Sequence, residues 1–174
     1  MFRRMKEPFE LPSTQRNAPP TIKEKSAVQR SVTKLLDALA PERTTSRTER
    51  APAPIEQYRT PSGCVLQAAT AALSVSWFPD AATDTSLGEL QVVLWRGVVT
   101  RRGAAAVRET PTVIRELTLR PIEQALGGLG WRDESDETVY DLDALVAKCL
   151  ALLENQVAGG SHTQPPPKMP RRRD

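Results

Sequence analysis

The stretch Leu87–Gly103, LGELQVVLWRGVVTRRG, decides the fold because it is the strongest β-strand signal in the chain. Apolar residues occupy both alternating sets of positions, Leu90, Val92, Leu94 and Val98 on one and Val93, Trp95 and Val99 on the other. A strand with two apolar faces is typical of the interior of a sheet. Gly97 predicts a bulge or a close backbone approach in this strand. Trp95 is expected to pack in the core, against a neighbouring strand or the C-terminal helix.

Further strands are expected at 69–77, 112–120 and, in shorter form, 138–140. The first and second of these alternate apolar and polar residues, as half-buried strands do. Residues 64–73, CVLQAATAAL, fit the start of a helix equally well, because alanine is the best helix former. Residues 121–128, PIEQALGG, predict a helical turn closed at Gly127.

A C-terminal helix is the clearest element of the sequence. Asp141 is a suitable N-cap, and Gly159 and Gly160 follow the last apolar residues. The apolar stripe consists of Leu142, Leu145, Val146, Cys149, Leu152 and Leu153. A helix with so wide a stripe must cover a sheet or another helix. The sequence therefore predicts an α+β domain at 63–158, with a three- or four-stranded antiparallel sheet packed by the C-terminal helix.

A separate amphipathic helix is expected at 21–40. Thr21 and Glu24 have the spacing of a capping box, and Pro41 ends the helix. Its apolar stripe consists of Val28, Val32, Leu35, Leu36 and Leu39. An isolated helix of this length is marginal, so the stripe needs a surface. Two interpretations stay open: the stripe docks on the chain's own domain, or it binds another molecule, in a groove or by self-association.

The remaining segments are expected to be tails and a linker. Residues 1–20 predict a disordered N-terminal tail, 41–62 a Pro/Ala/Arg-rich linker, and 159–174 a disordered basic tail. Residues 1–60 carry 12 basic and 7 acidic side chains, residues 61–157 carry 8 and 13, and residues 158–174 carry 4 and 1. Basic arms thus flank an acidic domain, an arrangement that adds affinity for anionic partners.

The sequence does not indicate an enzyme, a metal site or a cofactor. His162, the single histidine, lies in the expected tail, where no rigid element holds it. Cys64 and Cys149 are too few for a zinc site, and GGLG at 127–130 lacks the lysine of a P-loop. The acidic residues of 133–143 are expected to be a solvated loop and a charged helix N-terminus rather than a cation site. An autoinhibitory contact between this segment and the basic tails, or between it and Arg101 and Arg102, is a further hypothesis.

The expected location is intracellular and cytoplasmic. Two cysteines do not make a disulfide framework, which favours a reducing compartment. Glu7, Pro8 and Glu10 stand where a signal peptide needs apolar residues, and no stretch approaches the ~20 apolar residues of a membrane span. Organellar targeting stays open, since the first sixty residues are rich in Arg, Ser and Thr.

These observations favour a non-enzymatic adaptor or scaffold that binds a protein partner, or itself, through helix 21–40 and the α+β domain. The alternative is a nucleic-acid-binding accessory protein that uses sheet arginines and the basic tails. Its contact residues would be Arg96, Arg101, Arg102, Arg108, Arg171, Arg172 and Arg173. Neither hypothesis includes a membrane or a small-molecule substrate.

Overall fold

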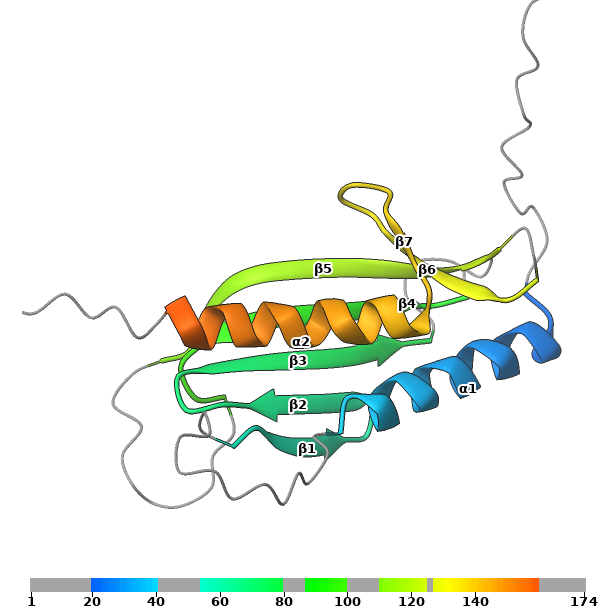
Figure 1. Cartoon of the computed structure of the whole chain (residues 1–174). Helices are drawn as coiled ribbons and strands as arrows, with labels where there is room; N and C mark the ends of the chain where they lie inside the picture. The colour runs from blue at the N-terminus through cyan, green and yellow to red at the C-terminus, as the bar shows by residue number, and fades with distance from the viewer. Residues whose placement is uncertain (1–19, 41–53, 80–86, 100–109, 125–126, 160–174) are drawn as a thin grey trace, which may run out of the picture.

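The computed structural model describes residues 20–40, 54–79, 87–99, 110–124 and 127–159. It contains two helices and seven strands (Figure 1). In chain order they are α1 (Ile22–Ala38), β1 (Glu56–Thr60), β2 (Gly63–Gln67), β3 (Ala71–Phe78), β4 (Glu89–Arg96), β5 (Thr112–Glu123), β6 (Leu129–Asp133), β7 (Val139–Tyr140) and α2 (Leu142–Gly159).

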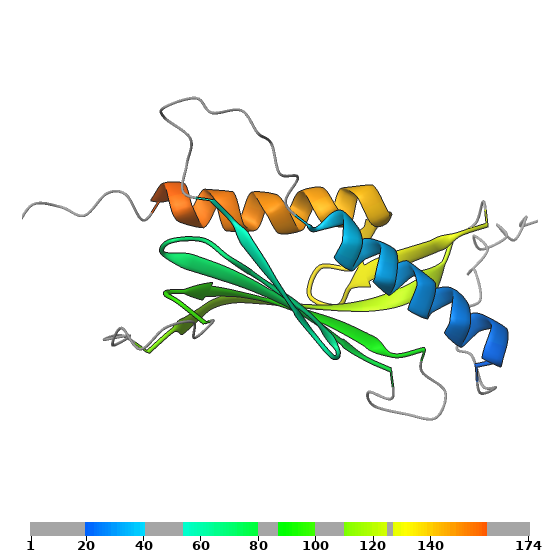
Figure 2. The same cartoon turned by 90° about the horizontal axis from the view of Figure 1, so that it is seen from below.

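The strands form one antiparallel sheet in which each strand pairs with the next along the chain, in the order β1-β2-β3-β4-β5-β6-β7. Helix α2 lies across one side of this sheet, with α1 beside it (Figures 1 and 2). The α+β class and the packing of the C-terminal helix are thereby confirmed. The expected strand number is too low, because the sheet has seven strands rather than three or four.

The first three strands lie in a region where the sequence indicated a linker and an ambiguous apolar run. Residues 56–60 of the expected linker form β1, which pairs with β2 across the turn at Pro61 and Ser62. Residues 63–67 and 71–78 then form the next hairpin, so the helical interpretation of 64–73 is wrong. A side chain at Gly63 would meet the Val75 carbonyl oxygen at 1.8 Å, so only glycine allows β2 to approach β3 here.

Strand β5 is longer than expected. It continues through Pro121 to Glu123 and pairs there with β6, which replaces the expected helical turn. Pro121 lies beyond Leu119, the last residue of β5 that pairs with β4, so it has a strand partner on one side only, where proline is tolerated. Strand β4 ends at Arg96, and the irregular pairing with β5 falls between Leu94 and Trp95 rather than at Gly97.

The core lies between the helices and one face of the sheet. Its strand side chains include Leu66, Leu73, Val75, Trp77, Leu90, Val92, Leu117, Leu119 and Trp131. Helix α2 adds Leu145, Cys149 and Leu153, and helix α1 adds its whole apolar stripe to the same cluster. The boundary expected at residue 63 therefore divides a single core, because α1 and β1 belong to the same packed unit as the rest.

Two tryptophans meet inside this core. Trp77 and Trp131 form an edge-to-face pair with ring centroids 5.9 Å apart and an interplanar angle of 87°. Gly88 makes room for the pair, since a side chain there would meet the Trp77 ring at 2.5 Å, and its φ of 107° also favours glycine. Within the described residues neither indole N–H has a hydrogen-bond partner.

Candidate interaction surface

The apolar stripe of α1 is not a free surface. Val28, Val32, Leu35, Leu36 and Leu39 are between 0% and 8% exposed, all within the chain's own core. Side chains of β1 attach the helix to the sheet: the Gln57 amide donates to the Leu36 carbonyl at 2.8 Å, and Arg59 pairs with Asp37. Of the two interpretations of this helix, the structure shows the docked one. A partner cannot reach the stripe while the helix is docked.

Most arginines of the nucleic-acid hypothesis lie outside the described residues. Arg101, Arg102, Arg108, Arg171, Arg172 and Arg173 all belong to this group. Arg96 is described, and it is exposed at the end of β4, opposite Thr112. The structure therefore brings no set of these arginines together.

The acidic segment 133–143 is used for local turns. The Asp133 carboxylate is buried and accepts hydrogen bonds from the Ser135 amide and hydroxyl at 2.8 Å and 2.7 Å. Asp136 accepts from the Thr138 amide, which lowers the pKa of its exposed carboxyl. Asp141 accepts from the Ala144 amide at 2.8 Å, so the expected N-cap of α2 is present. These carboxylates stabilise the β6–β7 hairpin and the helix start rather than forming a cation site.

No described helix or strand covers the opposite face of the sheet, but residues 97–99 lie over part of it: the Gln67 side chain donates to the Gly97 carbonyl at 3.3 Å and accepts from the Val99 amide at 2.9 Å. Side chains alternate between the two faces of a strand, so the partners of the buried residues point away from the helices. We call this surface the open face. It includes Glu56, Tyr58, Val65, Gln67, Ala72, Ser74, Ser76, Phe78, Glu89, Gln91, Val93, Trp95, Val113, Glu116, Thr118, Arg120, Arg132 and Val139.

Trp95 is the central large side chain of the open face. It is half-buried, and its indole N–H donates to the Ser74 hydroxyl across the β3–β4 pair at 2.9 Å. The indole therefore extends toward Ser74, whose cross-strand partner Val93 is only 7% exposed. Trp95 was expected in the core, against a neighbouring strand or the C-terminal helix. It contacts the neighbouring strand β3 but lies outside the core, because α2 covers the other side of the sheet.

Large and small side chains are unevenly distributed across the open face. Tyr58 stands on β1 and Trp95 on β4, while the two strands between them present Val65, Ala72 and Ser74. Phe78, at the end of β3, is 42% exposed. Val65 and Ser74 are half-buried, so the surface between the two aromatic side chains is accessible at these residues and closed at Ala72 and Gln67, which are buried.

The open face carries three carboxylates, Glu56, Glu89 and Glu116, and two arginines, Arg120 and Arg132, so it has a small excess of negative charge. Arg120 is compensated, since it bonds Glu134 at 2.6 Å and approaches Glu89 at 3.9 Å. Glu56 accepts a hydrogen bond from Tyr58 and Glu116 accepts one from Gln91, and neither pairs with a cation among the described residues. Two carboxylates that accept hydrogen bonds, Glu56 on β1 and Glu116 on β5, therefore lie on either side of the aromatic side chains.

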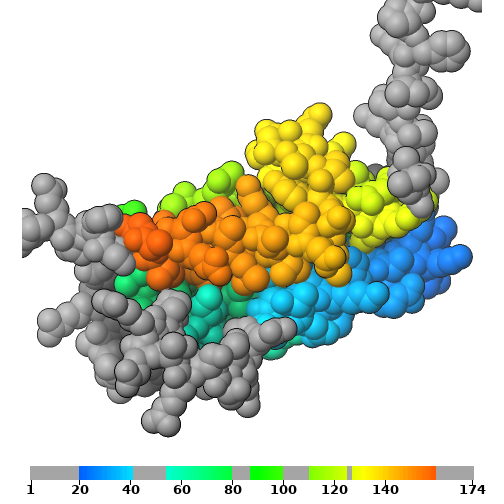
Figure 3. All heavy atoms as spheres, viewed as in Figure 1, coloured from blue at the N-terminus to red at the C-terminus, as the bar shows by residue number. Residues whose placement is uncertain are grey.

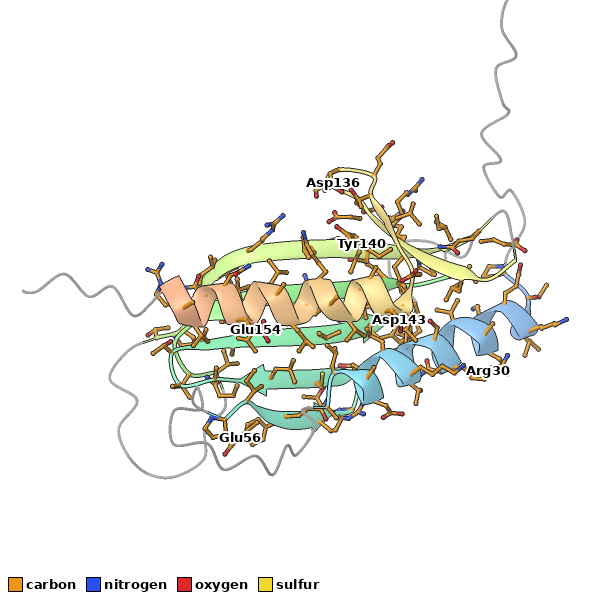
Figure 4. All side chains as sticks on the ribbon, viewed as in Figure 1. Arg30, Glu56, Asp136, Tyr140, Asp143 and Glu154 are labelled. Atoms are coloured by element: carbon orange, nitrogen blue, oxygen red, sulfur yellow. The ribbon has the colours of Figure 1, made fainter. Side chains whose placement is uncertain are left out.

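A basic ridge runs along the outer side of α1. Lys23, Arg30 and Lys34 are exposed at intervals of seven and four residues, which places them in line on the helix surface, opposite the buried stripe. The row extends about 16 Å at 1.5 Å per residue. Figure 4 shows Arg30 on this helix, with the carboxylates of Asp143 and Glu154 on α2. The helix layer is thus basic along α1 and acidic along α2.

A pocket of about 290 Å³ lies between the start of α1, the end of β3 and the start of β4. Its walls are Ile22, Lys25, Ser26, Gln29, Trp77, Pro79 and Leu87. Lys25 is the single charged group among them. The indole N–H of Trp77 has no access to solvent, so it does not face the space of the pocket. The lining offers no pair of groups for acid–base or nucleophilic chemistry.

The two thiols are unsuited to nucleophilic chemistry. Cys64 and Cys149 are free and buried. Burial raises the pKa of both, that of Cys149 to about 12. The reactive form of cysteine is the thiolate, which is scarce at neutral pH in both sites.

Searches of the described residues for two other kinds of site were negative. They contain no group of three or more side chains placed to hold a metal ion. None of their helices has the length and apolar content required to cross a membrane.

Comparisons of the chain with protein-family models, with curated proteins and with solved structures found no match.

Proposed function

We propose that this protein is a non-enzymatic adaptor or scaffold module that binds a protein partner through its open face. The observation that carries the proposal is the one-sided architecture of the described chain: both helices cover one face of a seven-stranded sheet, and the other face presents Trp95, Tyr58 and Phe78. Water solvates one face of many antiparallel sheets, but such a face is normally polar. Half-buried tryptophan and tyrosine are instead characteristic of protein interfaces.

The docking surface differs from the one that the sequence favoured. An adaptor that used the stripe of α1 would have to remove Leu35 and its neighbours from the core, and each such side chain costs about 1.5–3 kcal/mol to expose. Binding at the open face requires no such rearrangement. Helix α1 therefore contributes to function by completing the core that holds the sheet in shape.

The test is site-specific photo-cross-linking in cells that express the gene. Ser76 on the open face and Ala147 on the outer side of α2 are each replaced by a photoreactive phenylalanine derivative. We expect a discrete heavier adduct from position 76, none from position 147, and loss of the adduct when Trp95→Ala is added. Equal adducts from both positions, or an adduct that survives Trp95→Ala, would contradict the proposal.

Nucleic-acid binding is the second candidate, and the basic ridge of α1 is the observation that favours it. Lys23, Arg30 and Lys34 form a row of cations that phosphates could follow, whereas the open face is negative and unsuited to a polyanion. The interface would then lie on α1, a location that differs from the sheet arginines expected from the sequence.

A salt series separates the two candidates. Affinity of the full chain for a fluorescent single-stranded oligonucleotide should fall steeply as salt increases. The triple variant Lys23→Ser, Arg30→Ser, Lys34→Ser should lose most of the binding and show a shallower salt slope. Arg96→Ser provides the control for the opposite end of the sheet. Binding that is absent at low salt, or unchanged in the triple variant, excludes the α1 ridge.

A further inference from the structure

The open face has the chemistry that recognises a basic, proline-rich segment, and this step rests on the function proposed above. Aromatic side chains bind the exposed prolines of a polyproline II helix, whose stiffness keeps the entropic cost of binding low. Trp95 and Tyr58 provide two such rings, with the half-buried side chains of Val65 and Ser74 between them. Glu56 and Glu116 provide negative charge at either side for cationic residues.

The chain itself contains a segment with the matching composition. Residues 165–173 read PPPKMPRRR, with four prolines, four cationic side chains and no acidic one. A run of three prolines favours the polyproline II conformation. The segment follows α2 in the sequence, so the end of α2 at Gly159 is the point from which its reach is judged.

The end of α2 lies close enough for this segment to reach the open face. Figure 1 shows the last turns of α2 over the end of the sheet where β3 begins and β4 ends. Trp95 lies at the same end of the sheet, since it pairs with Ala72 near the start of β3. Pro165 is six positions beyond Gly159, a span of about 20 Å when extended. Packed layers of secondary structure lie about 10 Å apart, so a chain of this length can pass from the helix layer around the end of the sheet to the open face.

We propose that residues 165–173 dock on the open face of the same chain, with the prolines against Trp95 and Tyr58 and the arginines near Glu116 and Glu56. The segment would then compete with a protein partner for binding to the open face. A partner that binds the open face must displace it or carry a segment of the same chemistry with higher affinity.

Paramagnetic relaxation in the full chain tests this contact. The native thiols of Cys64 and Cys149 are buried, so a spin label added to the variant Thr163→Cys attaches selectively to the new cysteine. We expect signal loss at the Trp95 indole N–H and at the Val65 and Val93 methyl groups. Signals of Lys23 and Arg30 on the outer side of α1 should keep their intensity.

Charge variants supply the controls. Replacement of Arg171, Arg172 and Arg173 by serine in the labelled chain should restore the open-face signals, as should high salt, since the attraction between exposed charges is screened. Glu116→Gln should weaken the contact. Glu154→Gln, which removes an equally exposed carboxylate on the helix side, should leave it unchanged.

Several outcomes overturn the proposal. They are absence of signal loss on the open face, signal loss confined to the β6–β7 hairpin near Asp136, and loss that appears only when labelled and unlabelled chains are mixed. The mixed sample would show a contact between copies instead. If the relaxation experiment shows no contact but the Trp95-dependent cross-link forms, the docking of residues 165–173 is refuted and the proposed partner surface is supported. If the relaxation experiment shows the contact but no cross-link forms, the proposed protein partner is refuted and the intrachain contact is supported.

Discussion

The two buried thiols show how the core controls the chemistry of single residues. Cys149 is fully buried on α2, and burial is the main reason why its pKa is raised to about 12. Nearby Cys64 adds to the rise and Lys148 opposes it. The neutral thiol behaves as a small apolar side chain, as it does in most buried cysteines. Its charged form is strongly disfavoured in the fold, which links the stability of the protein to pH.

We expect the free energy of unfolding to fall as the pH rises above about 9, in part because of Cys149. The unfolded thiol loses its proton near the ordinary pKa of 9.0, whereas the folded thiol keeps it until about 12. Between these values the unfolded chain binds fewer protons, so alkali favours unfolding, by up to about 1.4 kcal/mol per pH unit. Urea denaturation of the wild type and of Cys149→Ala at several pH values measures the difference.

The two denaturation series should converge at high pH. Cys149→Ala should be the less stable protein at pH 7, because it leaves a void in the core. Its alkaline slope should be shallower, since it lacks the buried thiol. Parallel curves for the two proteins would show that Cys149 ionises as easily in the fold as in the unfolded chain.

Trp95 marks the limit of what alternation in the sequence can predict. The sequence correctly indicated that its strand lies inside the sheet, but both faces of the strand are apolar, so alternation could not say which face the helices cover. The Ser74 hydroxyl, which fixes the indole, comes from a different strand. Only the register of β3 against β4 brings the two together, and a one-residue shift would place them on opposite faces.

At the scale of elements, the helices were the easier part to predict. The capping box at Thr21 and the N-cap at Asp141 are both present in the structure, because local side chain–backbone contacts determine them. The docking of α1 depends instead on distant residues, Gln57 and Arg59 of β1 among them. Those residues lie in a segment rich in proline and polar side chains, which is why a linker was expected there.

Substitution of Leu35 tests the docking of α1. The side chain is fully buried in the shared core, so Leu35→Ala should lower the free energy of unfolding by about 2–5 kcal/mol. Lys34→Ala is the matched control, since it changes the next residue on the exposed side and introduces a good helix former. Chemical denaturation monitored by the buried tryptophans measures both. A Leu35→Ala protein as stable as the wild type would show that the helix detaches in solution.

The strands that the sequence missed share a physical reason. Strands β1, β2 and β6 have five residues each, and glycine or polar residues interrupt them. Periodicity over so few residues is weak evidence, and the pairing partner decides the outcome. The open face could not be predicted for the same reason, because it exists only once seven strands are in register.

At the scale of the whole molecule, one core holds together elements from both ends of the described chain. Helices α1 and α2 contact each other, and each packs on the same face of the sheet (Figure 3). Their outer surfaces carry opposite charges. The fold therefore separates its roles by side: the helix side provides stability and a charge asymmetry, and the open face provides the recognition chemistry.

The shared core predicts that the segment 63–158 does not fold alone. A chain that begins at Gly63 lacks the five buried side chains of α1 and the pairing partner of β2. It would expose Cys64 and Leu66 at a new sheet edge, and the lost burial of the five α1 side chains, about 7–15 kcal/mol, is comparable to the whole free energy of about 5–15 kcal/mol that typically stabilises a protein. A chain that begins at Pro20 keeps every described element and serves as the control. Amide dispersion in NMR spectra should be native in the longer chain and collapsed in the shorter one; native dispersion in both would show that α1 and β1 are dispensable for folding.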